Sequence, residues 1–139
     1  MTNHAKRAVA LFEQGYGCAQ ATAAAFAEEL GVERALLLRV TAGLGAGRGG
    51  LRETCGAVSA MAIVAGLAAA PFAPDDLAAK QALYARIREL DEAFVRRHGT
   101  TVCAQLLERA GVPAGPGPSA RTAEYYAARP CSDLVATAA

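Results

Sequence analysis

Apolar residues recur along this chain at the spacing of an α-helix, and no stretch alternates between apolar and polar residues as a half-buried strand does. Near the start, one apolar stripe with positions i, i+3, i+4 and i+7 comprises Ala5, Ala8, Val9 and Phe12. This stripe predicts a helix over residues 3–14. The remaining periodicity predicts helices at about 18–30, 33–42, 53–70, 75–98, 102–110 and 130–137, with a helical turn at 121–128.

Helix-ending residues separate these segments. Gly31 follows the second predicted helix, and Pro71 and Pro74 follow the fourth. The chain has 139 residues, is 53% hydrophobic and contains no Trp, and this length corresponds to one domain. We therefore expect a single all-α domain over residues 1–139, a compact bundle of about five to seven helices around a buried, Ala- and Gly-rich central helix at about 53–70.

A glycine-rich stretch precedes the central helix. Five glycines fall within Gly43–Gly50, and the chain then passes through Arg52 and Glu53 to Cys55. The loop does not end in Gly-Lys-Ser/Thr, and a predicted helix rather than a strand comes before it, so phosphate-loop and dinucleotide-binding motifs are disfavoured. We interpret the stretch as a tight turn between packed helices, with a binding loop as the alternative.

The central helix also raises the question of a membrane span. The run Cys55–Phe72 has 18 residues without a charge, which just reaches the length that a spanning helix needs. It consists mostly of Ala and Gly and is only weakly hydrophobic. We interpret it as a buried helix and expect no membrane insertion.

Charge and composition limit the classes of partner. A formal net charge of +1 gives no electrostatic basis for binding nucleic acid. The high apolar content of a small chain suggests an additional buried surface, such as a homodimer interface. The first apolar segment is interrupted by Glu13 and Gln14, unlike a signal peptide, so we expect a cytoplasmic location in which thiols stay reduced.

Four cysteines carry the main chemical signal. They are Cys18, Cys55, Cys103 and Cys131, and none belongs to a Cys-x-x-Cys pair, so any shared site must be assembled by the tertiary fold. Each lies at or near a predicted helix start, where free N–H groups and the helix dipole stabilise a thiolate. Thiolates are the nucleophilic and metal-binding form of cysteine. The alternative is that the four residues are small buried hydrophobes.

Residues close to the cysteines in sequence are candidates for supporting roles. Gly17 and Gly56 flank two of the cysteines and permit close backbone approach. Arg52 and Arg48 lie close to Cys55 in sequence, where they either raise the positive potential and hold an anion or form an exposed pair. The motif Gly-x-Ser-x-Gly is absent, so the sequence does not support hydrolase chemistry.

Four short segments together resemble the C_GCAxxG_C_C family of small redox-active proteins, which is named for its four cysteines. The matching segments are 15–21 (GYGCAQA), 54–60 (TCGAVSA), 99–107 (GTTVCAQLL) and 131–135 (CSDLV). They follow one another in the family's order and spacing and cover residues 15–135. The resemblance implies a redox or metal role for the four cysteines, and it supplies no substrate.

Two positions depart from the family pattern. Ala60 stands where the family usually has Gly, a small change within a helix. The family's glycine loop usually carries an aromatic residue and a Met, roughly where Leu44 and Arg48 lie here. An arginine in place of an apolar residue changes what this loop can hold.

Three hypotheses follow for function. In the first, the four cysteines form a metal or iron–sulfur site for electron transfer or sensing, with zinc as the other candidate cofactor. In the second, cysteine pairs cycle between dithiol and disulfide and exchange electrons with an unidentified redox partner; Cys18 and Cys55 are the favoured pair because both follow glycine-rich turns. In the third, the protein is a helical homodimeric interaction module with structural cysteines.

Overall fold

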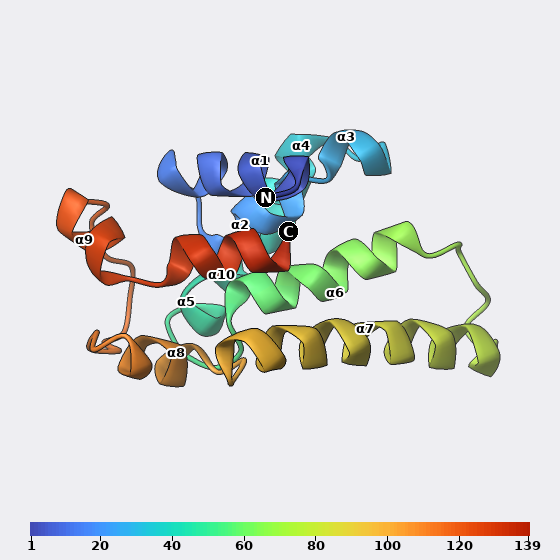
Figure 1. The fold of residues 1–139 in the computed structure, drawn as a ribbon. Helices are drawn as coiled ribbons and strands as arrows, with labels where there is room; N and C mark the ends of the chain where they lie inside the picture. The colour runs from blue at the N-terminus through green and yellow to red at the C-terminus, as the bar shows by residue number, and fades with distance from the viewer.

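A computed structural model describes all residues from 1 to 139, and its regular structure is entirely helical (Figure 1). The elements are α1 (Asn3–Glu13), α2 (Cys18–Ala24), α3 (Ala27–Leu30), α4 (Arg34–Thr41), the 3₁₀ turn η1 (Ala42–Leu44), α5 (Gly45–Arg48), α6 (Gly56–Ala68), α7 (Leu77–His98), α8 (Cys103–Arg109), α9 (Ala123–Ala128) and α10 (Cys131–Ala138). The all-α prediction is confirmed. There are more segments than the five to seven expected because the structure includes very short helices such as α3 and α5.

The helix predicted over residues 18–30 is divided in two. Phe26 has φ −100° and ψ 0°, which interrupts the α-helical backbone between α2 and α3. Its ring stacks on His4 of α1, with 4.2 Å between the ring centroids. The break therefore accompanies a tertiary contact that the local helix propensity does not contain.

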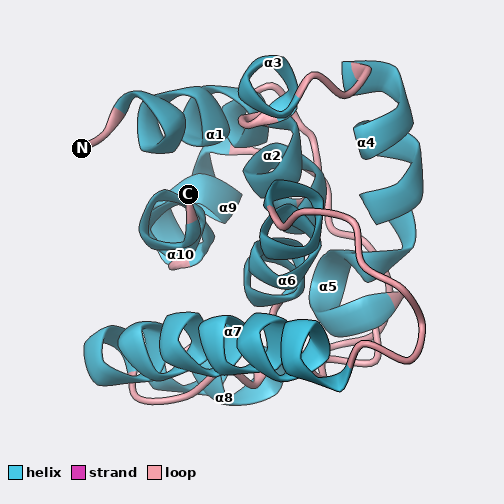
Figure 2. Cartoon of the chain, turned by 90° about the vertical axis from the view of Figure 1, so that its right-hand side faces the viewer, coloured by secondary structure: helices cyan, strands magenta, loops and turns pink.

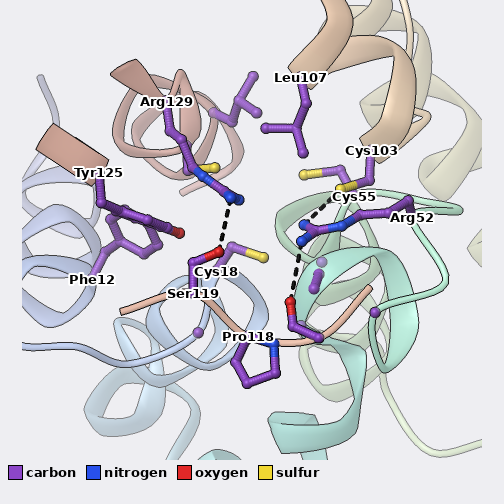
Figure 3. Close-up of a pocket in the computed structure, with 18 of the residues that line it drawn as sticks. Phe12, Cys18, Arg52, Cys55, Cys103, Leu107, Pro118, Ser119, Tyr125 and Arg129 are labelled. Carbon is purple, nitrogen blue, oxygen red and sulfur yellow. Dashed lines mark hydrogen bonds between the residues drawn. The ribbon is translucent and has the colours of Figure 1, made fainter. Parts of the chain in front are cut away.

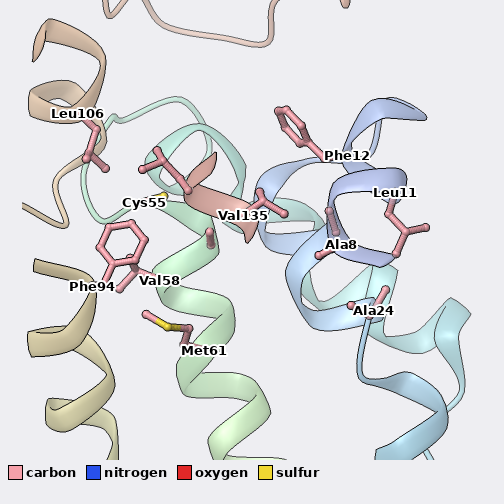
Figure 4. Packing of buried hydrophobic residues seen from close by; sticks show 14 residues of the cluster. Ala8, Leu11, Phe12, Ala24, Cys55, Val58, Met61, Phe94, Leu106 and Val135 are labelled. Carbon is pink, nitrogen blue, oxygen red and sulfur yellow. The ribbon is translucent and has the colours of Figure 1, made fainter. Parts of the chain in front are cut away.

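Helices α2 and α6 form the centre of the molecule. They pack against each other, while α1 and α10 cover one side and α7 lies along the other (Figure 2). The largest fully buried side chains include Phe12 of α1, Phe94 of α7 and Val135 of α10. These residues belong to one cluster, and Figure 4 shows Phe94 and Val135 near the N-terminal half of α6, with Phe12 on the α1 side. Alanines of α2, several of them completely buried, let the helices approach closely.

The predicted central helix is shorter and less buried than expected. It begins at Gly56 rather than near 53, and its buried residues all lie in the first half, up to Met61. Towards the C-terminal end the side chains become half-buried and then exposed, and Leu67 is 43% exposed. The absence of charge along this run predicted a helix correctly, but it overestimated how far the neighbouring helices cover it.

Helix α7 shows the same incomplete cover. Asp76 caps it by accepting a 3.0 Å hydrogen bond from the backbone N–H of Ala79. Of the predicted apolar stripe only Phe94 is fully buried, whereas Leu83, Ile87 and Leu90 are half-buried. The reason is length: at 22 residues α7 extends well beyond the 13 residues of α6, about 33 Å against about 20 Å.

An apolar groove of about 670 Å³ lies between α6 and α7. Apolar surface remains exposed at the outer ends of both helices. The homodimer expected from the composition stays a prediction. Helix α4 likewise buries Leu37 but exposes Leu36 and Val40. None of the helices combines the length and the apolar character that a membrane span requires.

Candidate functional site

All four cysteines lie at helix starts, as the sequence predicts. Cys18, Cys103 and Cys131 are the first residues of α2, α8 and α10. Cys55 is the residue immediately before α6, one position outside the helix rather than within its first turn. The four thiols are free.

The fold brings the four starting points together. One cavity of about 470 Å³ is lined by Cys18, Cys55, Cys103 and Cys131 (Figure 3). However, no group of three His, Cys, Asp or Glu side chains is arranged to hold a metal ion. The four thiols therefore do not converge on one point. The arrangement therefore combines a shared cavity with one pair of neighbouring thiols, Cys18 and Cys55.

Backbone pairing holds two of the cysteine segments side by side. An isolated antiparallel bridge joins Thr54 to Val102. Next to it, the N–H of Cys55 donates to the carbonyl of Thr101 at 2.8 Å, and the N–H of Cys103 donates to the carbonyl of Glu53 at 2.6 Å. The start of α6 and the start of α8 are thus fixed to each other although Cys55 and Cys103 are 48 positions apart in the chain.

Gly56 permits the closest approach in the site. A Cβ atom added at this residue would lie 2.6 Å from the sulfur of Cys18 and 2.7 Å from the carbonyl oxygen of Leu44. Both distances are far shorter than van der Waals contact. A glycine is required here so that the start of α6 can lie directly against Cys18. Gly56 can therefore support the site by permitting this close approach.

Gly17 has a different part in the site. It precedes α2 and also lines the cavity. Its N–H donates to the side-chain oxygen of Gln20 at 2.9 Å, and the amide nitrogen of Gln20 donates to the carbonyl of Leu38 at 2.9 Å. This short chain of hydrogen bonds ties the start of α2 to α4 and so fixes the position of Cys18.

The thiols of Cys18 and Cys55 influence each other, and their pKa values are shifted in opposite directions. The pKa of Cys18 is lowered from 9.0 to about 6, chiefly by the hydrogen bond from Cys55 and further by backbone N–H groups of Ala46, Ala19 and Gly56, against the opposing effect of burial. The pKa of Cys55 is raised well above its usual value by the same hydrogen bond, by burial and by the negative charge of Cys18. The pair therefore holds one proton and one thiolate, and the thiolate resides on Cys18.

The glycine-rich stretch supplies one of the N–H donors through an unusual backbone. Four consecutive residues, Ala46, Gly47, Arg48 and Gly49, have φ between 54° and 69°, so this turn is left-handed. At Gly47 a Cβ atom would lie 2.6 Å from the Cα of Arg52, which excludes any larger residue. Left-handed backbone costs a non-glycine residue about 1–2 kcal/mol, so Ala46 stores strain beside the Cys18 thiolate. The predicted tight turn is present, and it also lines the cavity.

Cys131 lies in the same cavity with a different environment. Burial is the main cause that raises its pKa to about 11, and the negative charge of Cys18 adds to the effect. Arg129 acts in the opposite direction but does not overcome burial. At neutral pH this cysteine is a thiol.

The two arginines near Cys55 in sequence have different environments. Arg48 is exposed and forms a 2.7 Å ion pair with Glu53. Arg52 is only 8% exposed and lines the cavity, where one guanidinium nitrogen lies 3.8 Å from the sulfur of Cys103. The expectation of an exposed pair is therefore wrong for Arg52. Its backbone has φ 57°, in the left-handed region.

Several residues that line the cavity were not assigned to the site from the sequence. Phe12, Arg121, Tyr125 and Arg129 line the cavity, and the guanidinium of Arg121 stacks 4.3 Å from the ring centroid of Phe12. Arg129 lies two positions before Cys131, and this proximity is a signal in the sequence that indicates it. Nothing in the sequence indicates the N–H of Ala46, because a backbone donor is set by conformation and not by residue type.

Comparison with protein families matches residues 16–139 to the family described as "Putative redox-active protein (C_GCAxxG_C_C)". The match covers nearly the whole chain and includes all four cysteines. Neither the curated proteins nor the solved structures include a significant match to this sequence.

Proposed function

The chain belongs to the C_GCAxxG_C_C family of putative redox-active proteins, and we propose that its redox centre is the pair Cys18 and Cys55, which cycles between a dithiol and a disulfide. One observation carries the proposal. Both cysteines line one cavity, and the neighbouring Cys55 thiol is the main cause that lowers the pKa of Cys18 to about 6. A thiolate with a protonated neighbour is the arrangement that thiol–disulfide exchange requires.

The exchange proceeds in two displacements. The Cys18 thiolate attacks one sulfur of a disulfide R–S–S–R, forming a mixed disulfide and releasing one thiolate R–S⁻, which takes up a proton from solvent. Cys55 then loses its proton, attacks the sulfur of Cys18 and releases the second R–S⁻. The balance is one disulfide plus the protein dithiol giving two thiols plus the Cys18–Cys55 disulfide, a two-electron oxidation of the protein.

The acidities of the pair suit this order of events. Two of the causes that raise the pKa of Cys55 are its hydrogen bond to Cys18 and the negative charge on Cys18. Both disappear when Cys18 enters a mixed disulfide, so Cys55 loses its proton more readily at the step where it must attack. An external dithiol reverses the sequence and restores the reduced protein.

The test is equilibration of reduced protein in buffers of reduced and oxidised dithiothreitol, followed by acid quench, alkylation and peptide mass spectrometry. The expected product is a single Cys18–Cys55 disulfide, with Cys103 and Cys131 alkylated. Cys18→Ser and Cys55→Ser should each abolish it, whereas the matched control Cys103→Ser should retain it. A folded wild-type protein that gives no Cys18–Cys55 disulfide at any buffer ratio would contradict the proposal.

A second candidate is a four-cysteine cluster site, and one observation favours it: all four cysteines line the same cavity. Four thiolates are the usual ligands of [2Fe–2S] and [4Fe–4S] clusters. In the present arrangement the residues do not fit a single zinc ion, since no three of them are placed to share one. Visible absorbance and iron and sulfide content of anaerobically purified protein test the cluster, and colourless protein without iron would exclude it.

A further inference from the structure

The charged side chains that line the cavity are three arginines and the Cys18 thiolate, so positive charge is in excess. Arg52, Arg121 and Arg129 line it, and no Asp or Glu does. The ion pairs of the protein involve other residues, so none of these three arginines has a carboxylate partner. Three guanidinium groups against one thiolate give the cavity a positive potential.

Arg52 is the most deeply enclosed of the three. Its guanidinium donates to the carbonyls of Gly115 at 2.9 Å and Gly117 at 3.3 Å and lies 3.8 Å from the sulfur of Cys103. These partners orient the side chain but do not neutralise it. Charged groups that are nine-tenths buried are rarely left without a counter-charge. The Cys18 thiolate balances only one of the three guanidinium groups, so a further anion would be stabilised in the cavity.

Arg129 faces the cavity from the other side. Figure 3 shows Arg52 and Arg129 entering on opposite sides of Cys18. Arg129 donates one hydrogen bond, 3.0 Å long, to the hydroxyl of Ser119, and its guanidinium lies 4.6 Å from the ring centroid of Tyr125. The remaining N–H groups of this guanidinium have no protein acceptor among these contacts, and a planar guanidinium suits a carboxylate in two-point contact.

The cavity also has the size and wall of a small-ligand site. Its volume of about 470 Å³ lies within the usual range for ligand pockets, roughly 300–1,000 Å³. Leu106, Leu107 and Leu134 provide apolar wall, while Gly45, Gly49 and Gly117 leave backbone open to a ligand. A folded protein loop that carries a disulfide is a much larger object than this cavity.

From this combination we propose that the cavity selects a low-molecular-weight disulfide carrying carboxylates, held by Arg52 and Arg129 with a sulfur presented to Cys18. The proposal rests on the dithiol function of Cys18 and Cys55. The reaction is the exchange written above, in which the anionic disulfide is reduced to two thiols and the protein pair is oxidised.

The experiment compares three disulfides of different charge with the reduced full-length protein. The probes are oxidised glutathione, which is anionic, hydroxyethyl disulfide, which is neutral, and cystamine, which is cationic. Formation of the Cys18–Cys55 disulfide is followed by acid quench and mass spectrometry, and each rate is divided by the rate of the same probe with free dithiothreitol. The normalised rate should be highest for the anionic probe, lower for the neutral probe and lowest for the cationic probe. Added salt should reduce the differences between these rates.

Arg129→Gln tests the assigned residue. It should lower the ratio of the anionic rate to the neutral rate by about tenfold, which corresponds to the loss of one charge-assisted contact of about 1.4 kcal/mol. Arg39→Gln removes an equal charge from an exposed residue outside the cavity and should leave the ratio unchanged. Ser119→Ala removes the hydrogen-bond partner of Arg129 but keeps the arginine charge. It therefore shows whether the effect of Arg129→Gln comes from the lost hydrogen bond or from the lost charge.

The outcomes distinguish this inference from the proposed function. Equal normalised rates for the three probes, or equal effects of Arg129→Gln and Arg39→Gln, would overturn the anionic preference while the dithiol function stands. Absence of the Cys18–Cys55 disulfide with every probe would overturn the dithiol function itself.

Discussion

Cys18 and Cys131 occupy the same position in their helices, the first residue, and they line the same cavity, yet their thiols differ in acidity by several orders of magnitude. The pKa of Cys18 is lowered to about 6, and that of Cys131 is raised to about 11. Both side chains are largely withdrawn from water, so burial alone does not separate them.

The difference lies in the hydrogen bonds that other segments supply. Cys18 receives one from the thiol of Cys55, and N–H groups of Ala46 and Gly56 add to its own helix's donor. For Cys131, burial is the largest influence, and the charges of neighbouring cysteines and arginines only modify it. A helix start therefore makes a thiolate possible, but donors from elsewhere in the fold decide whether one forms.

The largest expected effect is on the reactivity of the two thiols. At neutral pH a pKa near 6 leaves about 90% of Cys18 as thiolate, whereas a pKa near 11 leaves about 0.01% of Cys131. The more basic thiolate is intrinsically the better nucleophile, which reduces the advantage to about 30- to 100-fold. Iodoacetamide labelling of the folded protein, resolved by peptide mass spectrometry, should show Cys18 reacting faster by about this factor. Equal labelling rates would contradict the difference in thiol pKa between Cys18 and Cys131.

The second prediction concerns pH and stability. Cys18 has a depressed pKa in the folded protein, so the unfolded chain binds more protons between pH 6 and pH 9.0. The free energy of unfolding should therefore rise with pH across this window, by at most about 1.4 kcal/mol per pH unit, and the contribution should be lost as pH falls through about 6. Urea denaturation at several pH values measures the slope.

The matched variants for this measurement are serine substitutions at the two compared cysteines. Cys18→Ser should flatten the slope between pH 6 and pH 9.0, because serine does not titrate there. Cys131→Ser should preserve it, because the raised pKa of Cys131 lies above this window. If the slope persists in Cys18→Ser, another titrating group causes the pH dependence of the free energy of unfolding.

The third prediction removes the close approach of α6 to Cys18. Gly56→Ala places a methyl group where the sulfur of Cys18 and the carbonyl of Leu44 already lie, so it should destabilise the protein by about 1–3 kcal/mol. It should also slow the labelling of Cys18 by displacing the N–H donors of α6. Gly66→Ala, in the same helix with open space around it, should instead stabilise by about 0.5–1 kcal/mol. Similar effects of the two substitutions would contradict the packing argument.

The smallest effect is expected at Ala46. Glycine at this left-handed position relieves strain, and the gain of about 1–2 kcal/mol is partly offset by the greater freedom of glycine in the unfolded chain, about 0.4–1 kcal/mol. Ala46→Gly should therefore stabilise by about 0.5–1 kcal/mol and leave Cys18 labelling unchanged, since the N–H donor is retained. Ala82→Gly, in the regular helix α7, should destabilise by about 0.5–1 kcal/mol. Chemical denaturation measures both.

By itself, the sequence determined the helices and the chemistry that they can carry. Apolar spacing predicted the all-α class, and glycine and proline positions located most helix boundaries, such as the end of α3 at Gly31. These features are local, because they depend on residues within a few positions of one another. The placement of four cysteines at helix starts was predictable for the same reason.

Only the tertiary structure decided which cysteine becomes the thiolate. The donors to Cys18 come from Cys55, Ala46 and Gly56, at sequence separations of 28 residues or more, and two of them act through the backbone. The burial of Arg52 depends in the same way on the carbonyls of Gly115 and Gly117. A pKa responds to burial and to charges and hydrogen bonds within a few ångströms, and the folded chain creates these surroundings from segments that the sequence keeps apart.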